Sequence, residues 1–206
     1  MGSLIILNGS PRAPRSNSRR YAGIVSRHYR GSVEYHNISR TNHIELCSKL
    51  ENFSDLLLVF PLYADGIPVT LLDLLKTLEQ NPPSIKPVIS VLVNCGFLEY
   101  QQNDIAVQMV ELFCKQNGYK FGSVLKIGSG EAILDTPFKP LAAWKINQLA
   151  SSISHGRYRV LHTTLPLSPK MFIRASQKYW INYGRQYGVT QKEMASLQIE
   201  PAKTKE

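Results

Sequence analysis

Short apolar segments rich in isoleucine, leucine and valine recur along this chain, and most are closed by proline, asparagine or glycine. Continuous apolar runs of this length are typical of strands that are buried on both faces of a sheet. They occupy residues 3–8, 55–61, 87–96 and 123–130, and residues 32–38 alternate as a half-buried strand does. The pattern therefore predicts five strands.

Helical patterns fill the gaps between the predicted strands. They cover residues 17–30, 42–51, 68–80, 103–118 and 140–153. Strands that alternate with helices form a parallel sheet covered on both faces. Five such strands suit a doubly wound α/β sheet of order 2-1-3-4-5. In such a sheet the ligand lies at the carboxyl ends of the strands, where the strand order reverses between strands 1 and 3.

The sequence divides after the fifth helix. We expect one domain over residues 1–158 and a helical C-terminal extension over residues 159–206, packed on that domain or on a partner subunit. Ser168 and Pro169 are suited to begin a helix, as N-cap and first helical residue, and Gly188 is suited to end it.

Cysteine usage excludes several classes of protein. Cys47, Cys95 and Cys114 are odd in number and lie far apart, so they match no zinc or iron–sulfur spacing, and we expect no metal site. The chain has no apolar run long enough to span a membrane and no leader-like start. We therefore expect reduced thiols, a cytoplasmic location and no membrane partner.

Positive charge is concentrated at the two ends of the chain. The formal net charge is +9, from 24 basic and 15 acidic residues. Residues 1–40 contain seven arginines and a single acidic residue, Glu34. A basic chain can bind nucleic acid, but no nucleic-acid-binding motif accompanies these charges. We expect small anionic molecules as partners and no nucleic acid. A solvated basic face without a partner is the alternative.

The segment NGSPRAPRSNS follows the first predicted strand and contains no acidic residue. A phosphate monoester needs hydroxyl, amide and guanidinium donors close to a helix N-terminus, where free N–H groups and the positive end of the dipole meet. This segment offers all of them, and an ordinary loop with a helix cap is the alternative. The candidate donors are Ser10, Arg12, Ser16, Asn17 and Ser18.

Two further loops follow the third and fourth strands. FPLYADGIP holds one aromatic ring, Tyr63, between two prolines, and VNCGFLE holds Gly96, where the backbone can approach a ligand closely. Rigid backbone of this kind suits the edge of a planar heterocycle, and Tyr63 could stack on it or flank it. Cys95 is interpreted as a small apolar residue rather than a nucleophile, because no histidine is fixed beside it.

Taken together, these three loops resemble those of the NAD(P)H-dependent FMN reductases of the flavodoxin-like superfamily. The C-terminal segment SPKMFIRASQKYWINYGRQYGVTQKEM also resembles the extension found in one bacterial branch of that family. The resemblance implies a flavodoxin-like fold and an FMN whose phosphate lies on the donors named above. It further implies that the isoalloxazine ring contacts Pro61, Leu62, Tyr63, Ala64 and Asp65 on one side and Asn94, Cys95 and Gly96 at its other edge.

The resemblance also implies an activity. The expected protein is an oxidoreductase that passes hydride from NADPH or NADH through FMN to a small acceptor, such as a flavin, a quinone, or an azo or nitro compound. No catalytic acid or base is expected, because the cofactor carries the chemistry. Family members are usually oligomers, so we expect a homodimer.

Two other classes of function remain open. One is an electron carrier of the flavodoxin type, although such carriers are acidic as a family and this chain is basic. The other is a binding or regulatory protein that keeps the fold with little turnover. Reduction by NADPH separates the first alternative from a reductase, and uptake of FMN separates the second.

Overall fold

The structure, a computed structural model, describes residues 2–196. The described residues form two compact units, which meet in the sequence between Leu165 and Pro166. The strand Val160–Thr163 lies in the first unit, although residues 159–206 were expected to be a helical extension. Residues 197–206 of that predicted extension lie outside the described residues.

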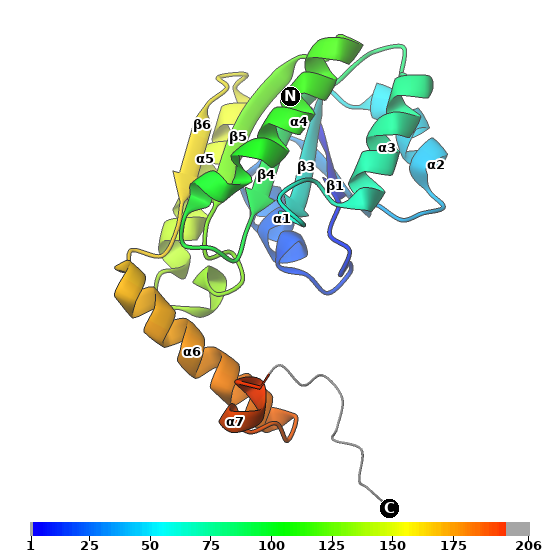
Figure 1. Ribbon diagram of the computed structural model, residues 1–206. Helices are drawn as coiled ribbons and strands as arrows, with labels where there is room; N and C mark the ends of the chain where they lie inside the picture. Colours follow the sequence, from blue (N-terminus) through cyan, green and yellow to red (C-terminus); the bar gives the residue numbers. More distant parts are fainter. Residues whose placement is uncertain (1, 197–206) are drawn as a thin grey trace, which may run out of the picture. The chain divides into compact units, whose positions relative to one another are not determined.

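The first unit is built on a parallel sheet of six strands in the order β2-β1-β3-β4-β5-β6 (Figure 1). The prediction of five strands was wrong in number, because β6 extends the predicted order beside β5. The strands are β1 (Ser3–Asn8), β2 (Ser32–Asn37), β3 (Asp55–Pro61), β4 (Val88–Asn94), β5 (Phe121–Ile127) and β6 (Val160–Thr163).

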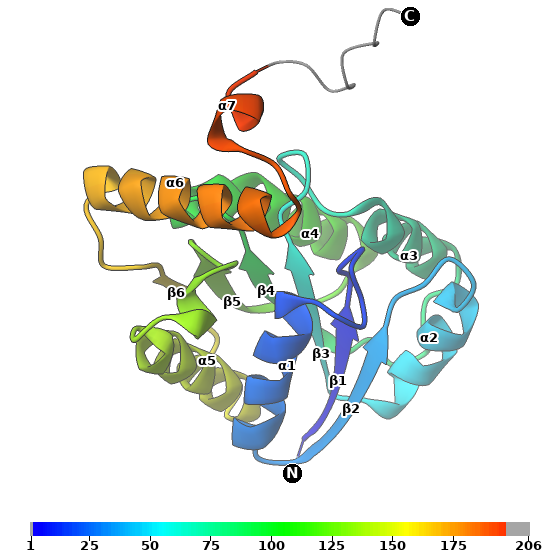
Figure 2. The ribbon, with the colours of Figure 1, turned by 90° about the horizontal axis from the view of Figure 1, so that it is seen from below.

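Helices cover both faces of this sheet, as the buried strand pattern requires (Figure 2). One face carries α1 and α5, and the other carries α2, α3 and α4. The helices of this unit are α1 (Asn17–His28), α2 (His43–Lys49), α3 (Val69–Gln80), α4 (Asp104–Asn117) and α5 (Lys139–Ser154), with 3-10 turns η1 (Leu50–Asn52), η2 (Tyr100–Asn103) and η3 (Ile133–Asp135).

Each central strand divides its side chains between the two helical layers. Ile5 and Leu7 of β1 belong to the core beneath α2, α3 and α4, whereas Leu4 and Ile6 are fully buried on the other side. Because successive residues of a strand point to opposite faces, a strand buried on both faces is apolar throughout. This explains why β1, β3 and β4 have no polar alternation.

The helix boundaries follow local signals in the sequence. Ser16 has extended backbone angles and its hydroxyl accepts a hydrogen bond from the Arg19 amide, so it caps α1. Gly118 adopts the left-handed conformation with φ 67° and ends α4. Ser168 likewise caps α6 through the Met171 amide.

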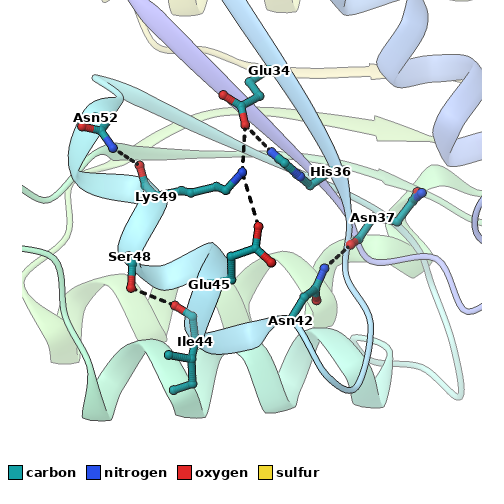
Figure 3. Close-up of polar contacts among 9 residues, drawn as sticks. All are labelled: Glu34, His36, Asn37, Asn42, Ile44, Glu45, Ser48, Lys49 and Asn52. Atoms are coloured by element: carbon teal, nitrogen blue, oxygen red, sulfur yellow. Dashed lines mark hydrogen bonds and ion pairs between the residues drawn. The ribbon is translucent and has the colours of Figure 1, made fainter.

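Charged side chains connect the edge strand β2 to α2 (Figure 3). The Glu34 carboxylate lies 2.5 Å from the His36 ring and 3.4 Å from the Lys49 ammonium, which also pairs with Glu45. These contacts lower the pKa of Glu34. Partly exposed pairs of this kind contribute little stability individually, and here they connect α2 to an edge strand.

The second unit contains α6 (Pro169–Gln186) and α7 (Gln191–Met194). The two helices pack closely, since a side chain at Gly184 would collide with Met194. Thr190 and Glu193 form a capping box at the start of α7. In the part of the chain that the structure describes, no helix is long and apolar enough to cross a membrane.

Candidate functional site

Loops at the carboxyl ends of β1, β3, β4 and β5 surround one cavity of about 490 Å³. Of the thirteen residues predicted from the sequence, eleven line this cavity, and Ala64 and Asp65 do not. The lining residues that were predicted are Ser10, Arg12, Ser16, Asn17, Ser18, Pro61, Leu62, Tyr63, Asn94, Cys95 and Gly96.

The N-terminus of α1 supplies free backbone donors to the cavity. The first N–H groups of a helix have no partner within the helix. The Arg19 amide is satisfied by the Ser16 hydroxyl at 3.2 Å, which leaves the amides of Asn17 and Ser18 available. The positive end of the helix dipole lies at the same place. This end of the cavity is therefore suited to an anion.

Arginines add permanent charge to this end. Arg12, Arg15, Arg19 and Arg20 all line the cavity, against one carboxylate, that of Glu131. Arg12 and Arg15 are exposed and form no ion pair among residues 2–196. Their guanidinium groups are therefore free to bind an anionic ligand.

Arg20 has a different role, because it is bound to Asp135. Its two guanidinium nitrogens donate to the two carboxylate oxygens at 2.8 and 2.5 Å. Arg20 also donates to the Asn17 side-chain oxygen at 2.9 Å, and Asn17 donates to the Glu131 carbonyl at 3.3 Å. The start of α1 is thereby fixed to the loop after β5.

This ion pair predicts a pH-dependent contribution to stability. The hydrogen bonds from Arg20 lower the pKa of Asp135. A carboxyl group with a lowered folded pKa contributes stability above its unfolded pKa of about 4 and loses that contribution as the pH falls through its folded pKa. We expect Asp135→Asn to lower the free energy of unfolding at pH 7 by less than about 1 kcal/mol, because both side chains are largely exposed.

Urea denaturation at pH 7 and at pH 3 measures this effect. The difference between the wild type and Asp135→Asn should shrink below pH 4. The control is Glu51→Gln, since Glu51 is exposed and forms no ion pair within the described residues. An equal destabilisation by Asp135→Asn at both pH values would contradict the assignment.

Asn8 organises the first loop from beneath and was not singled out from the sequence. Its buried side chain accepts a hydrogen bond from the Ser10 amide at 3.0 Å. Its amide nitrogen donates to Ser16 at 3.3 Å, to Tyr35 at 2.9 Å and to Asn37 at 3.1 Å. Asn8 thus links the two serines of the loop to the neighbouring strand β2.

The second loop, after β3, forms a tight turn. Tyr63 and Gly66 exchange two backbone hydrogen bonds of 3.0 Å, so Ala64 and Asp65 are the central residues of a two-residue turn. Both have positive φ, 45° and 57°. They project at the exposed tip of the turn, whereas Tyr63, 52% exposed, lines the cavity.

Asn94 and Cys95, in the third loop, are nearly buried. The Asn94 amide donates to the Phe60 carbonyl at 3.1 Å and to the Ser18 hydroxyl at 3.4 Å, so it connects β3, β4 and α1. The Cys95 sulfur accepts from the Asn103 amide at 3.3 Å, and burial raises the pKa of its thiol. A buried thiol of this kind is a poor nucleophile.

Gly96 differs from Gly130 because neither its φ nor its surroundings within the described residues require a glycine. Its φ lies outside the left-handed region, and a Cβ added at this position would meet no atom within 4 Å. By contrast, a Cβ at Gly130 in the next loop would approach Asn94 to 2.8 Å. Gly96 lines the cavity and is itself exposed, so an added Cβ there would meet no protein atom.

The fourth loop contributes residues that sequence reasoning missed. Glu131 lines the cavity, and the Tyr21 hydroxyl donates to the Gly130 carbonyl at 2.6 Å. Tyr21 is buried, and this burial raises its pKa. Arg19 and Arg20 were missed as well, because charged residues in the first turns of a helix usually face solvent. Their proximity to the predicted phosphate donors was the available signal.

Comparison with known proteins identifies the fold. No protein-family model and no curated sequence matches the chain. Among solved structures, the rubredoxin oxygen:oxidoreductase of Desulfovibrio gigas matches with a TM-score of 0.60 and 10% identity, over 76% of this chain. This chain spans 36% of the length of that protein.

Two smaller proteins match over nearly their whole length. The FMN-dependent NADH-azoreductase of Bacillus anthracis, solved with FMN, has a TM-score of 0.56 and 12% identity over 74% of this chain and 99% of its own. The flavodoxin of Streptococcus pneumoniae has a TM-score of 0.54 and 14% identity over 75% and 98%. At these identities the likeness concerns the fold: the first unit is a flavodoxin-like α/β domain.

Proposed function

We propose that this protein is an FMN-dependent oxidoreductase that takes hydride from NADPH or NADH and delivers it to a small organic acceptor. The observation that carries the proposal is the cavity at the carboxyl ends of the strands. It is lined by three arginines that form no ion pair among residues 2–196 (Arg12, Arg15 and Arg19), by free helix amides at the same end, and by an exposed glycine. The flavodoxin-like fold supports this position, since such sheets bind ligands where the strand order reverses.

The phosphate of FMN is assigned to the N-terminus of α1. Arg12 and Arg15 would neutralise its charge with forked donors, and the hydroxyls of Ser10 and Ser18 and the first amides of α1 would complete the set. Ser16 accepts hydrogen bonds from Arg19 and Asn8 as a cap. Its hydroxyl proton remains available to the phosphate.

The ring of FMN is assigned to the second and third loops. Pro61, Leu62 and Tyr63 form one wall, and Gly96 leaves room at the opposite side. A planar heterocycle next to a glycine avoids the steric conflict that any Cβ would introduce. The Leu62 amide donates to the Asn94 carbonyl at 2.7 Å, which joins the two loops.

The protein's part in the reaction is to position the cofactor and its substrates and to stabilise charge. When bound, FMN supplies hydride transfer between the nicotinamide and the acceptor. The one cysteine that lines the cavity is buried, and the proposal gives the lining residues the roles of binding and orienting the cofactor. The surplus of arginines also attracts the phosphates of a pyridine nucleotide.

Replacing Gly96 tests the assignment of the ring. Gly96→Ala should leave the free energy of unfolding nearly unchanged, because the added methyl group meets no protein atom. It should raise the Kd of FMN about tenfold or more, since overpacking against the ring costs about 1–3 kcal/mol. Titration of flavin fluorescence measures the Kd. The control is Gly23→Ala on α1, where an added Cβ also meets nothing and lies outside the cavity.

Steady-state turnover tests the activity. Protein loaded with FMN should oxidise NADPH or NADH faster than free FMN does, in the presence of a quinone or an azo dye. An electron carrier shares this fold, as the pneumococcal flavodoxin illustrates, and would take up FMN without rapid reduction by either nucleotide. The net charge of +9 favours a reductase over a carrier. Turnover no faster than that of free FMN would refute the reductase assignment.

A further inference from the structure

A second cavity, of about 420 Å³, lies near the amino ends of the strands of the same sheet. It is bordered by the loop between α1 and β2 and by the end of α5 with the loop leading to β6. Loops that enter parallel strands lie at their amino ends, and this cavity shares no lining residue with the proposed flavin site. Its lining consists of Arg30, Trp144, Asn147, Gln148, Ser151, Ser152, His155, Arg157 and Arg159.

The charged side chains that line this cavity are all positive. Arg30, Arg157 and Arg159 line it, and no carboxylate does. None of the three forms an ion pair within residues 2–196. The C-termini of α1 and α5 lie nearby, and each carries about half a negative charge. Three guanidinium groups exceed that charge, so the cavity remains strongly positive.

Backbone hydrogen bonds fix the main chain at two of these arginines. Gly156 ends α5 with φ 61°, and the Arg157 amide donates to the Ser152 carbonyl at 2.9 Å. The Arg159 carbonyl accepts from the Val124 amide at 2.8 Å.

The two loops that carry the arginines are also tied to each other. The Arg30 amide donates to the Ser154 hydroxyl at 3.2 Å, and α1 and α5 lie side by side on one face of the sheet (Figure 2). The cationic groups therefore start from fixed backbone positions, which limits the entropy lost when an anion binds.

One face of α5 continues the cavity lining away from the three arginines. Trp144, Asn147, Gln148, Ser151 and His155 recur at the spacing of a single face of α5. Eleven residues of helix span about 16 Å. Trp144 is 53% exposed, and the ammonium of Lys145 lies 4.6 Å from the centroid of its ring. An exposed indole thus lies at one end of the groove and the arginines at the other.

We propose that this groove binds a nucleotide phosphate, with the base stacked on Trp144 and the phosphates on Arg30, Arg157 and Arg159. Base stacking on an aromatic side chain and charge-assisted contacts to phosphate are the two interactions such a ligand requires. The amides of Asn147 and Gln148 lie between them and offer both donors and acceptors for a sugar or a base edge. This site is independent of the proposed flavin site and uses none of its residues.

Isothermal titration calorimetry on the full chain saturated with FMN tests the proposal, with ADP, pyrophosphate and adenosine as probes. ADP should bind with one-to-one stoichiometry. The double variant Arg157→Ala/Arg159→Ala should raise the Kd of ADP at least tenfold, whereas Arg40→Ala, at an exposed arginine outside both cavities, should change it less than twofold. Trp144→Ala should raise the Kd of ADP about tenfold and leave that of pyrophosphate unchanged.

The unequal effect of Trp144→Ala on the two probes distinguishes a lost contact from misfolding, because a misfolded variant would lose both ligands. Absence of ADP binding at millimolar concentration would overturn the proposal, as would ADP binding that does not depend on Arg157 and Arg159. Equal affinity for pyrophosphate and ADP would assign the groove to phosphate alone. Tighter, arginine-dependent binding of a single-stranded oligonucleotide would assign it to nucleic acid. Either result would overturn the nucleotide proposal.

Discussion

Removing Arg12 and Arg15 together is expected to raise the Kd of FMN more than a hundredfold. These two arginines line the cavity without an ion partner among the described residues. A hydrogen bond to a charged group contributes about 1.5–3 kcal/mol, so the loss of two corresponds to at least a hundredfold in affinity. Each single variant should cost about tenfold. Titration of flavin fluorescence with Arg12→Ala/Arg15→Ala gives the value.

The matched control removes the same charge elsewhere. Arg27→Ala/Arg40→Ala lowers the net charge by two units at exposed positions that line neither cavity. Its effect on the Kd should be small and should vanish in high salt, because only long-range attraction is lost. If both double variants weaken FMN equally, the phosphate does not lie on Arg12 and Arg15.

Asn8→Ala is expected to lower the free energy of unfolding by about 2–4 kcal/mol and to weaken FMN binding as well. The side chain is fully buried and makes four hydrogen bonds. Its removal leaves the buried Ser10 amide without its acceptor, and an unsatisfied buried group costs about 1–3 kcal/mol. The cavity left by the amide adds to this cost.

Urea denaturation compares Asn8→Ala with Asn52→Ala. Asn52 is exposed, and its single side-chain hydrogen bond goes to the Lys49 carbonyl. A surface substitution of this kind should change the free energy of unfolding by about 0.5 kcal/mol or less. Equal destabilisation by the two variants would mean that the contacts of Asn8 do not organise the loop.

The central part of the fold was predictable because buried parallel strands carry a strong local signal. Residues 3–8 and 55–61 are continuous apolar runs, and the structure has strands there. Strand β6 was missed for the opposite reason. Val160–Thr163 is four residues long and mostly not buried, and its strand conformation depends on pairing with β5. A pairing between distant segments leaves no pattern in a short sequence window.

The candidate site was predictable to the extent that the rule for doubly wound sheets locates it. That rule brought Ser10, Tyr63 and Gly96 together from loops far apart in the sequence. It did not reveal Asn8, because its partners Tyr35 and Asn37 lie on another strand whose register the sequence does not show.

The turn after β3 depends on backbone geometry that the sequence pattern does not show. The structure centres the turn on Ala64-Asp65, both with positive φ, and pairs Gly66 with Tyr63. Ala64 and Asp65 therefore lie at the tip of the turn and do not line the cavity.

The most direct test of the flavin assignment is an absorption spectrum of the full chain that has been mixed with FMN and then separated from unbound FMN. Flavin absorbance should elute with the protein at one FMN per chain and should be bleached when NADPH or NADH is added without oxygen. A protein fraction that carries no flavin would contradict the assignment of this cavity to FMN.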